Sequence, residues 1–303
     1  MRIAFFSGSE ISIPFAENLL GEIVLFVTLS PKIRGRGNKV SPNPVKLFAD
    51  EYNKAVLEIE NFSQQIVNEI LSYKPDALVV FSFGKIIPKS ILELTKCPLN
   101  IHPSDLPMYR GASPIERQLM DGVSKSAVTI IKMNEEIDKG EILLKKHFDV
   151  SVYDDYFSFL KKVYDVGIPL LREALECCLK GMCSPVPQVG EGSYAKKIRK
   201  EEEKINWKED AFRIHNRVRA LTRIGAYTIF REKKLKIFKT DFLNEFFNNS
   251  TPGTIVYVHN EYFLVSSLKG CVKILRVQPE GKKIMDVKDF INGYKPKIGE
   301  VML

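Results

Sequence analysis

The chain contains the stretch LNIHPSDLP (residues 99–107), in which an apolar strand runs into a proline-bounded turn. Side chains alternate between the two faces of a strand, so Asn100 and His102 project to the same side. Asp138 follows His102 by 36 residues, within IDKG (residues 137–140). An amide that donates to a developing oxyanion and an imidazole that handles a proton suit acyl-type group transfer, and a nearby carboxylate would orient the imidazole. We therefore expect these three side chains to share one catalytic site.

Outward from this strand, the first 150 residues alternate short apolar runs with helical stretches, which predicts an α/β, Rossmann-like, doubly wound and mainly parallel sheet. The expected strands are 2–7, 23–29, 56–58, 77–81, 99–102 and 127–133, and the expected helices are 14–20, 44–52, 64–73, 88–94 and 114–121. Ligands of such sheets bind outside the carboxyl ends of the strands, where His102 and the turn at Phe83 and Gly84 fall. Because no G-x-G-x-x-G fingerprint follows the first strand, a dinucleotide cofactor is not predicted.

The rest of the chain predicts a second, smaller domain. A helix-like apolar run over 157–179 is followed by a Gly-, Pro- and Ser-rich stretch and a charged run, and then by an amphipathic helix expected over 207–223. Five strand-like runs come next, at 227–231, 235–239, 253–258, 263–267 and 272–277, which suits a small β-barrel. We expect a catalytic domain over 1–188, a basic linker over 189–206 and a C-terminal domain over 207–303.

Charge is distributed unevenly between these parts. The 303 residues carry a net charge of +8, with −1 on residues 1–188 and +9 on residues 189–303. A basic domain joined to a near-neutral one favours a nucleic-acid substrate held beside a small-molecule site, because cationic side chains release phosphate counterions. The alternative is a basic surface that only maintains solubility.

The cysteines and the apolar runs bear on the compartment. Five cysteines occur without C-x-x-C pairing or a histidine at metal-ligand spacing, so they are interpreted as thiols, and no metal site is expected. An odd number of cysteines without a disulfide framework fits a reducing compartment. No apolar run is long enough to cross a bilayer, and no signal peptide is predicted. The expectation is a cytoplasmic protein, as a monomer and without a membrane partner.

Longer strings resemble a known enzyme group. NIHPSDLPMYRGASPI (100–115) and MNEEIDKGEILL (133–144) are similar to the active-site region of the tetrahydrofolate-dependent formyltransferases. Within that superfamily the methionyl-tRNA formyltransferases are the most similar family, through further matches in order along the chain: RIAFFSGSEISIPF (2–15), KIRGRGNKVSPNPVK (32–46), PDALVVFSFGKIIP (75–88), YAKKIRKEEEKINW (194–207) and QPEGKKIM (278–285).

The resemblance implies an activity and assigns residues to it. Members of this family move a formyl group from 10-formyltetrahydrofolate, a co-substrate, to the amino group of initiator methionyl-tRNA at the start of protein biosynthesis, and their C-terminal barrel is of the oligonucleotide-binding (OB) type. The family's catalytic residues fall on Asn100, His102 and Asp138. Its folate-contacting stretch falls on Ser104, Asp105, Leu106 and Pro107, and we expect the folate also to lie against Phe83 and Gly84.

A cationic, glycine-containing segment over 32–39 is assigned to the tRNA. It is too polar for a core element, and taken alone it could be a surface loop or a cradle for phosphate. The resemblance implies that it enters the acceptor end of the tRNA, with Arg36 in the family's Gly-Arg-Gly position. An arginine can bind phosphate with two hydrogen bonds and stack on an unpaired base. Arg34, Lys39 and Lys46 would add positive charge.

Departures from the family pattern leave alternatives open. The usual Gly-Ser-Leu-Leu-Pro after the histidine is replaced here by PSDLP (103–107), which introduces Asp105 beside the expected folate site. The alternatives are a formyltransferase that acts on an amino sugar nucleotide or another small amine, a 10-formyltetrahydrofolate hydrolase, and a tRNA-binding protein without activity. His147, His215 and His259 are interpreted as structural or surface residues.

Overall fold

The structure is a computed structural model, which describes residues 1–31, 42–244 and 250–303. The chain forms two compact units, and each is assembled from separate segments. The first unit contains Met1–Ala112, Ser126–Phe148 and Lys162–Ala195, and the second contains Ser113–Lys125, Asp149–Lys161 and Lys196–Leu303. The division into 1–188, 189–206 and 207–303 stays a prediction.

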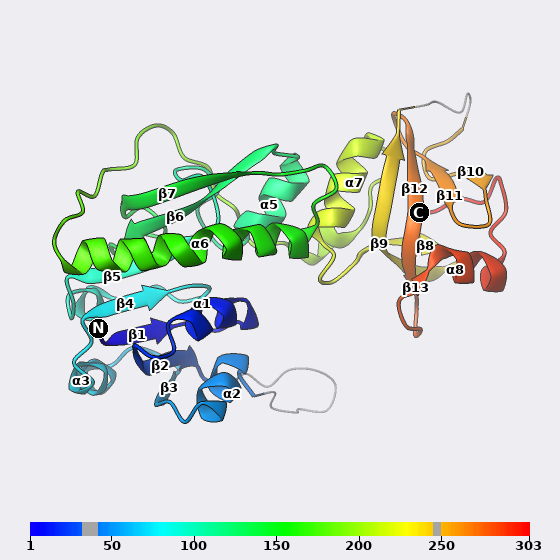
Figure 1. Ribbon diagram of the computed structural model, residues 1–303. Helices are drawn as coiled ribbons and strands as arrows, with labels where there is room; N and C mark the ends of the chain where they lie inside the picture. The colour runs from blue at the N-terminus through cyan, green and yellow to red at the C-terminus, as the bar shows by residue number, and fades with distance from the viewer. Residues whose placement is uncertain (32–41, 245–249) are drawn as a thin grey trace. The chain divides into compact units, whose positions relative to one another are not determined.

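The first unit is built on a seven-stranded sheet in the order β3-β2-β1-β4-β5-β6-β7 (Figure 1). The five strands from β3 to β5 in this order run parallel to one another, whereas β6 pairs antiparallel with β5. This order confirms the predicted Rossmann-like, mainly parallel sheet. The strands are β1 (Ile3–Phe6), β2 (Ile23–Leu29), β3 (Val56–Ile59), β4 (Ala77–Val80), β5 (Cys97–His102), β6 (Lys125–Lys132) and β7 (Glu141–Asp149).

Alternating side chains of the central strands separate two apolar layers. Ala4 and Phe6 of β1 face a cluster completed by α3 (Gln64–Ser72) and α4 (Lys89–Leu92). Phe5 packs edge-to-face on Phe26, which in turn contacts Phe48 of α2 (Pro44–Glu51). Both faces of the sheet are thereby buried, as parallel sheets require. The helices of this unit are α1 (Ile13–Asn18), α2 (Pro44–Glu51), α3 (Gln64–Ser72), α4 (Lys89–Leu92) and most of α6 (Tyr156–Leu179), with the short 3-10 turn η1 (Glu10–Ser12) before α1.

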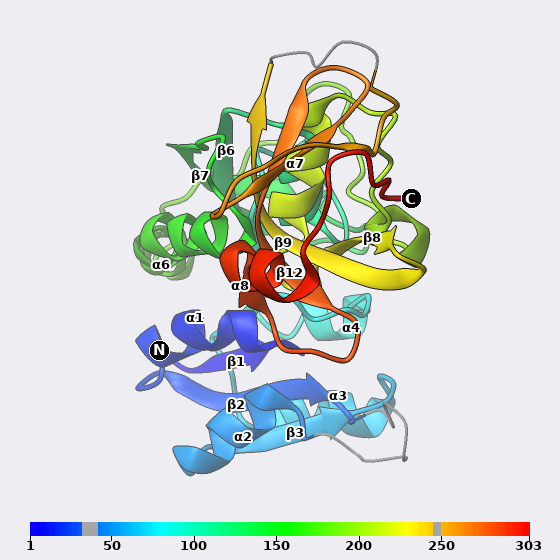
Figure 2. The same ribbon diagram turned by 90° about the vertical axis from the view of Figure 1, so that its right-hand side faces the viewer.

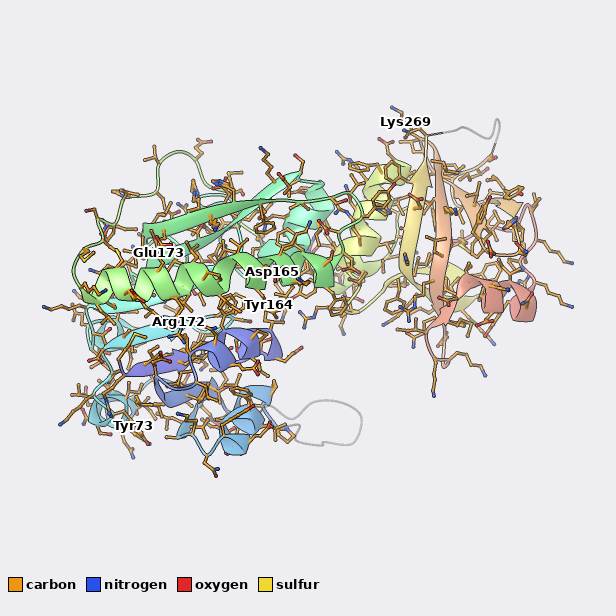
Figure 3. The ribbon with its side chains drawn as sticks, in the orientation of Figure 1. Tyr73, Tyr164, Asp165, Arg172, Glu173 and Lys269 are labelled. Atoms are coloured by element: carbon orange, nitrogen blue, oxygen red, sulfur yellow. A yellow bond between two sulfur atoms is a disulfide. The ribbon has the colours of Figure 1, made fainter. Side chains whose placement is uncertain are left out.

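Two polar side chains of α6 attach this helix to the start of the chain. The Tyr164 hydroxyl donates to the Ile11 carbonyl at 2.9 Å, and Arg172 donates to Glu22 at 2.5 Å. Figure 3 labels both residues on α6. The helix therefore lies on the face of the sheet that also carries α1 (Figure 1).

The second unit contains an antiparallel sheet in the order β10-β11-β12-β9-β8, with β13 paired to β12. Residues at the C-terminus connect the two outer strands of this path: Leu303 exchanges two backbone hydrogen bonds with Ile229 of β8, and the Ile255 amide of β10 donates to Glu300. The predicted small C-terminal β domain is thereby confirmed. Its strands are β8 (Ala226–Phe230), β9 (Lys233–Leu243), β10 (Ile255–Val258), β11 (Phe263–Ser266), β12 (Cys271–Pro279) and β13 (Met285–Asp286).

Helices complete the core of this unit. Phe290 of α8 (Val287–Tyr294) contacts Phe230 and Phe263 of the sheet, and Figure 2 shows α8 beside β12. The unit also contains α5 (Pro114–Asp121), the 3-10 turn η2 (Lys200–Glu203) and α7 (Ala211–Ala220). The helix predicted over 207–223 is thus shorter than expected.

Two further expectations need correction. The nine-residue strand β7 was not predicted, because its side chains do not alternate clearly between buried and exposed positions. The interpretation of the cysteines as thiols is wrong for four of them, since the structure joins Cys97 to Cys178 and Cys177 to Cys183. Among the described residues, no helix is both long enough and apolar enough to span a membrane.

Candidate active site

Strand β5 and the connection between β6 and β7 bring the three predicted catalytic side chains together. Asn100 Nδ2 donates to Asp138 Oδ1 at 3.1 Å, and His102 Nδ1 lies 3.5 Å from Asp138 Oδ2. The side chains of His102 and Asp138 are 5 % and 13 % exposed, so both are largely withdrawn from water. A carboxylate in such a place interacts more strongly with its neighbours than it would at the surface.

Backbone geometry holds the Asp138 carboxylate in this position. The Gly111 amide donates to Asp138 Oδ2 at 2.7 Å, and Asp138 itself adopts a left-handed backbone conformation with φ of 53°. Gly140, two residues later, passes so close to β6 that a β-carbon there would lie 2.0 Å from the Lys132 carbonyl oxygen. Only glycine fits that approach, which explains the glycine of the IDKG sequence.

The imidazole of His102 is held between two hydrogen-bond acceptors. Nε2 lies 2.8 Å from the Tyr109 carbonyl oxygen, and Nδ1 faces Asp138 on the other side of the ring. A neutral imidazole donates to only one of these groups, whereas an imidazolium donates to both. This arrangement is suited to a histidine that carries a proton during part of a reaction.

The turn assigned to folate is tied to the sheet. The Ser104 hydroxyl donates to the Met108 carbonyl at 2.6 Å, and the Thr129 hydroxyl of β6 donates to the Ser104 carbonyl at 2.7 Å. Leu106 is fully buried, and a cis peptide bond joins it to Pro107. The turn is therefore a fixed element beside His102.

Asp105, which departs from the family pattern, is paired with two residues of β7. Lys145 Nζ lies 2.6 Å from Asp105 Oδ1, and His147 Nε2 lies 3.2 Å from Asp105 Oδ2. Partial burial acts to raise the pKa of Asp105, but the hydrogen bonds and charges of Lys145 and His147 outweigh it, so the pKa is lowered overall. The additional acid is thus paired with a lysine and a histidine of the same unit, and His147 lies at the surface.

Phe83 and Gly84, the predicted folate contacts that follow β4, differ in their exposure. The Phe83 ring is buried and packs against Phe6 and Phe62, so its side chain belongs to the core. Gly84 follows with φ of 68°. Gly84 is exposed, so its backbone is the part of this pair that a ligand could reach.

Three of the four predicted tRNA contacts, Arg34, Arg36 and Lys39, lie outside the described residues. The fourth, Lys46 on α2, lies 3.3 Å from Asp50 and 4.0 Å from Glu58. Its positive charge is therefore shared with two carboxylates.

Two of the remaining histidines also pack as structural or surface residues. His215 of α7 is buried; its ring nitrogens lie 3.0 Å from Thr240 Oγ1 and 3.0 Å from the Val152 carbonyl oxygen, and burial lowers its pKa. His259 packs beside Tyr262 with ring centroids 4.8 Å apart.

Among the described residues, no group of three or more His, Cys, Asp or Glu side chains is arranged to hold a metal ion.

Several contacts of this site were not predicted. The Gly111 amide and the Tyr109 carbonyl act through the backbone, which side-chain patterns do not reveal. The Gln188 side chain bonds to the Asp138–Gly140 turn from a Pro-rich stretch of sequence that carries no periodic signal.

Comparison with known proteins places this geometry in a family. The sequence profile for formyl transferase matches residues 5–175, and the profile for the formyl transferase C-terminal domain matches residues 197–295. The chain belongs to the formyl transferase family. The resemblance noted from its sequence is therefore confirmed. Strand β5 and the turn after it lie within residues 5–175, which match the formyl transferase profile.

Relatives of similar length carry a more specific name. A methionyl-tRNA formyltransferase of Carboxydothermus hydrogenoformans is 39% identical over 307 residues, with 99% of each chain covered. One from Dictyoglomus thermophilum is 40% identical over 309 residues, again with 99% of each chain covered. Similarity to these formyl transferases thus extends along the whole chain.

Solved structures share the fold. An N-formyltransferase from Helicobacter canadensis, in complex with folinic acid and dTDP-3-aminofucose, has a TM-score of 0.66 at 19% identity, with 92% of this chain and 99% of that chain covered. HypX from Aquifex aeolicus, in complex with tetrahydrofolic acid, has a TM-score of 0.66 at 20% identity, with 99% of this chain and 48% of that chain covered. At these identities the similarity establishes the fold.

Proposed function

We propose that this protein transfers the formyl group of 10-formyltetrahydrofolate to the amino group of initiator methionyl-tRNA. The observation that carries the proposal is the position of the Asp138 carboxylate, which contacts both Asn100 and His102 beside the carboxyl end of β5. The end-to-end similarity to methionyl-tRNA formyltransferases supports the choice of donor and acceptor. The product would serve the initiation of protein synthesis.

The chemistry follows from what these side chains can donate and accept. The neutral amine of the methionyl group forms a bond to the formyl carbon, and the tetrahedral intermediate carries negative charge on oxygen. Collapse of this intermediate breaks the bond to folate N10, which gains a proton as the amine nitrogen loses one. Asn100 directs one N–H at Asp138, which fixes the plane of its amide and aims its second N–H at a defined place for the oxyanion.

His102 and Asp138 would handle the proton. The imidazole takes part in moving the proton or donates to the developing charge, and the carboxylate stabilises the imidazolium. Because binding holds the amine and the formyl carbon together, approximation supplies much of the lowering of the barrier. We do not assign His102 as the sole base.

The folate and the tRNA would occupy different parts of the chain. We place the folate against Ser104, Asp105, Leu106 and Pro107 and the backbone at Phe83 and Gly84. For the tRNA we place Arg34, Arg36, Lys39 and Lys46 at the acceptor end and the basic residues after 189 along its backbone. The excess of positive charge on residues 189–303 supports this assignment.

We further propose that the protein acts as a monomer, and that it acts in the cytoplasm because its proposed substrate is initiator tRNA. The disulfides Cys97–Cys178 and Cys177–Cys183 mean that its cysteines give no support for a reducing compartment. Asn100, His102 and Asp138 come from one unit of one chain, so a second copy is not needed to complete the constellation. Size-exclusion chromatography with light scattering tests whether the protein is a monomer, and a dimer at assay concentrations would refute that proposal.

A formyl-transfer assay tests the proposed function. Three proteins would be compared: native protein, Asn100→Ala and Arg36→Ala. Each would receive 10-formyltetrahydrofolate and either methionyl initiator tRNA or an amino sugar nucleotide as the acceptor, and formate release would be measured in parallel. We expect transfer to the tRNA by the native protein only, with folate binding retained by Arg36→Ala. Transfer to a small amine, or formate release without transfer, by folded native protein would overturn the proposal in favour of one of those activities.

A further inference from the structure

A segment between α6 and η2 lies against the loop that follows β5 and against the turn that carries Asp138. We call residues 188–195 the strap. Its Ser193 accepts from the Tyr109 amide through Oγ at 2.9 Å and from the Arg110 amide through its carbonyl at 2.9 Å, and the Ala195 amide donates to the Arg110 carbonyl at 2.6 Å. The strap therefore pairs with the chain directly before Gly111.

A glycine allows the strap to approach this closely. A β-carbon at Gly192 would lie 2.6 Å from Arg110 Nη1 and 2.6 Å from the Pro107 carbonyl oxygen. Any other residue would push the strap away from the turn that follows His102. The close contact of Gly192 with Arg110 and Pro107 therefore depends on glycine at this position.

Gln188 begins the strap and bonds to both loops of the site. Its Nε2 donates to the carbonyl oxygens of Asp138 at 2.7 Å and Gly140 at 2.8 Å. Its Oε1 accepts from Arg110 through Nε at 3.1 Å and Nη2 at 2.7 Å. The amide orientation is settled by its neighbours, since carbonyl oxygens lie on one side and guanidinium donors on the other.

These bonds use the whole hydrogen-bonding capacity of one side chain to fix the backbone on either side of Lys139. Such support stabilises Asp138, because the left-handed conformation costs a residue with a β-carbon more than it costs glycine. Residues 134–137 just before it are exposed, so the chain on that side supplies little packing. Gln188 holds the carbonyl of Asp138, while Gly111 and Asn100 hold its carboxylate.

We propose that Gln188 is a positioning residue for formyl transfer, which acts through Asp138 by holding the Asp138–Gly140 turn against Arg110. The inference rests on the proposed function, because it assumes that Asp138 takes part in the reaction. A loss of the Gln188 bonds would let the turn relax and shift the carboxylate relative to Asn100 and His102. Displacements of about 1 Å in such sites cost up to roughly a hundredfold in rate.

A double-mutant cycle separates this role from a general effect on the fold. Turnover and KM for both substrates would be measured for native protein, Gln188→Leu, Asp138→Asn and the double variant, with a thermal melt of each. Val189→Ala is the matched control, because the neighbouring Val189 side chain is 84 % exposed. Gln188→Glu, which keeps an acceptor for Arg110 but places a carboxylate against two carbonyl oxygens, replaces Gln188→Leu if the leucine variant does not fold.

We expect Gln188→Leu to lower kcat roughly tenfold to a hundredfold with KM values within about twofold, and Val189→Ala to behave as native protein. In the Asp138→Asn background, Gln188→Leu should cost almost nothing further, because the two changes disable the same group. Equal costs of Gln188→Leu in both backgrounds, or native kcat in Gln188→Leu, would overturn the inference while leaving the proposed function intact. Native activity in Asp138→Asn would overturn the inference together with the role of Asp138, whereas no transfer to the tRNA by folded native protein would overturn the proposed function.

Discussion

The amide of Asn100 and the carboxylate of Asp138 are joined by a 3.1 Å hydrogen bond, although 38 residues separate them in the sequence. Asn100 lies within the largely buried strand β5, and Asp138 lies in a turn with a left-handed backbone. The bond leaves the amide with a second N–H in a fixed direction. A rigid donor of this kind needs little reorganisation when negative charge develops on a reacting oxygen.

Removal of this donor should abolish most of the activity without unfolding the protein. We expect Asn100→Ala to lower kcat by about a hundredfold to a thousandfold, as in other enzymes that lose an oxyanion donor. Asn68→Ala is the control, because Asn68 is exposed on α3. Steady-state kinetics and a thermal melt would be compared, and a fall of less than fivefold in kcat would contradict this role.

The close approach of Gly140 to β6 should make that position intolerant of any side chain. In Gly140→Ala the added carbon would meet the Lys132 carbonyl oxygen at 2.0 Å, so the turn must move. We expect a loss of about 1–3 kcal/mol in the free energy of unfolding, together with reduced activity. Gly21→Ala, where a β-carbon has no neighbour within 4 Å, should change neither quantity appreciably. Urea unfolding measures the difference, and equal stability of the two variants would argue against the observed packing.

The pairing of Asp105 with Lys145 and His147 should contribute a modest, salt-dependent stability. Since the Asp105 side chain is 46% exposed, we expect Asp105→Leu to lower the free energy of unfolding by about 0.5–1 kcal/mol at low salt. Screening should reduce the difference toward zero in about 1 M NaCl. Unfolding curves at two salt concentrations test this expectation. An undiminished difference at high salt would mean that packing, and not charge, is responsible.

The ion pair between Glu202 and Arg117 in the second unit should make stability depend on pH. Arg117 donates to Glu202 at 2.6 Å, and this hydrogen bond is the main reason that the pKa of Glu202 falls from 4.5 to about 2. A carboxyl group whose pKa is lower in the folded state stabilises the fold above its unfolded pKa, and this contribution is lost as the pH falls toward the folded value. Native protein should therefore exceed Glu202→Gln in stability above about pH 5, with the gap closing between about pH 4.5 and pH 2. Melts across this range measure the gap, and a constant gap would contradict the assignment.

Local patterns predicted most of the architecture because the elements concerned have simple environments. β1 and β4 are buried at every position, and β5 at all but Asn100, so short apolar runs between turn residues were enough to find them. β7 escaped prediction because exposed, intermediate and buried positions follow one another without a clear period. Within the amphipathic helix predicted over 207–223, Arg219 is buried and donates to the carbonyls of Ser151 and Asp154, which the residue type alone does not reveal.

The residues of the candidate site also fall into those that the sequence predicted and those that it did not. Asn100, His102 and Asp138 were predictable because their chemistry is visible in the residue types and in the family resemblance. Gln188 was not, because its partners Asp138 and Arg110 lie 50 and 78 residues away and two of its bonds are to backbone carbonyls. Contacts of this kind depend on the assembled fold and leave no periodic trace in a single sequence.

The second unit is assembled from three stretches of the chain, and this limits how its gene could be recombined. Buried Arg219 and His215 bond to carbonyls in the stretch 149–161, which lies before most of α6 in the sequence. A chimera that exchanged only the residues after 206 would present these two side chains with acceptors from a foreign chain. Successful grafts of a related C-terminal domain should therefore also bring the donor's residues at 113–125 and 149–161. When only one crossover is made, the exchange should succeed best with donors whose sequences at 113–125 and 149–161 match those of this chain.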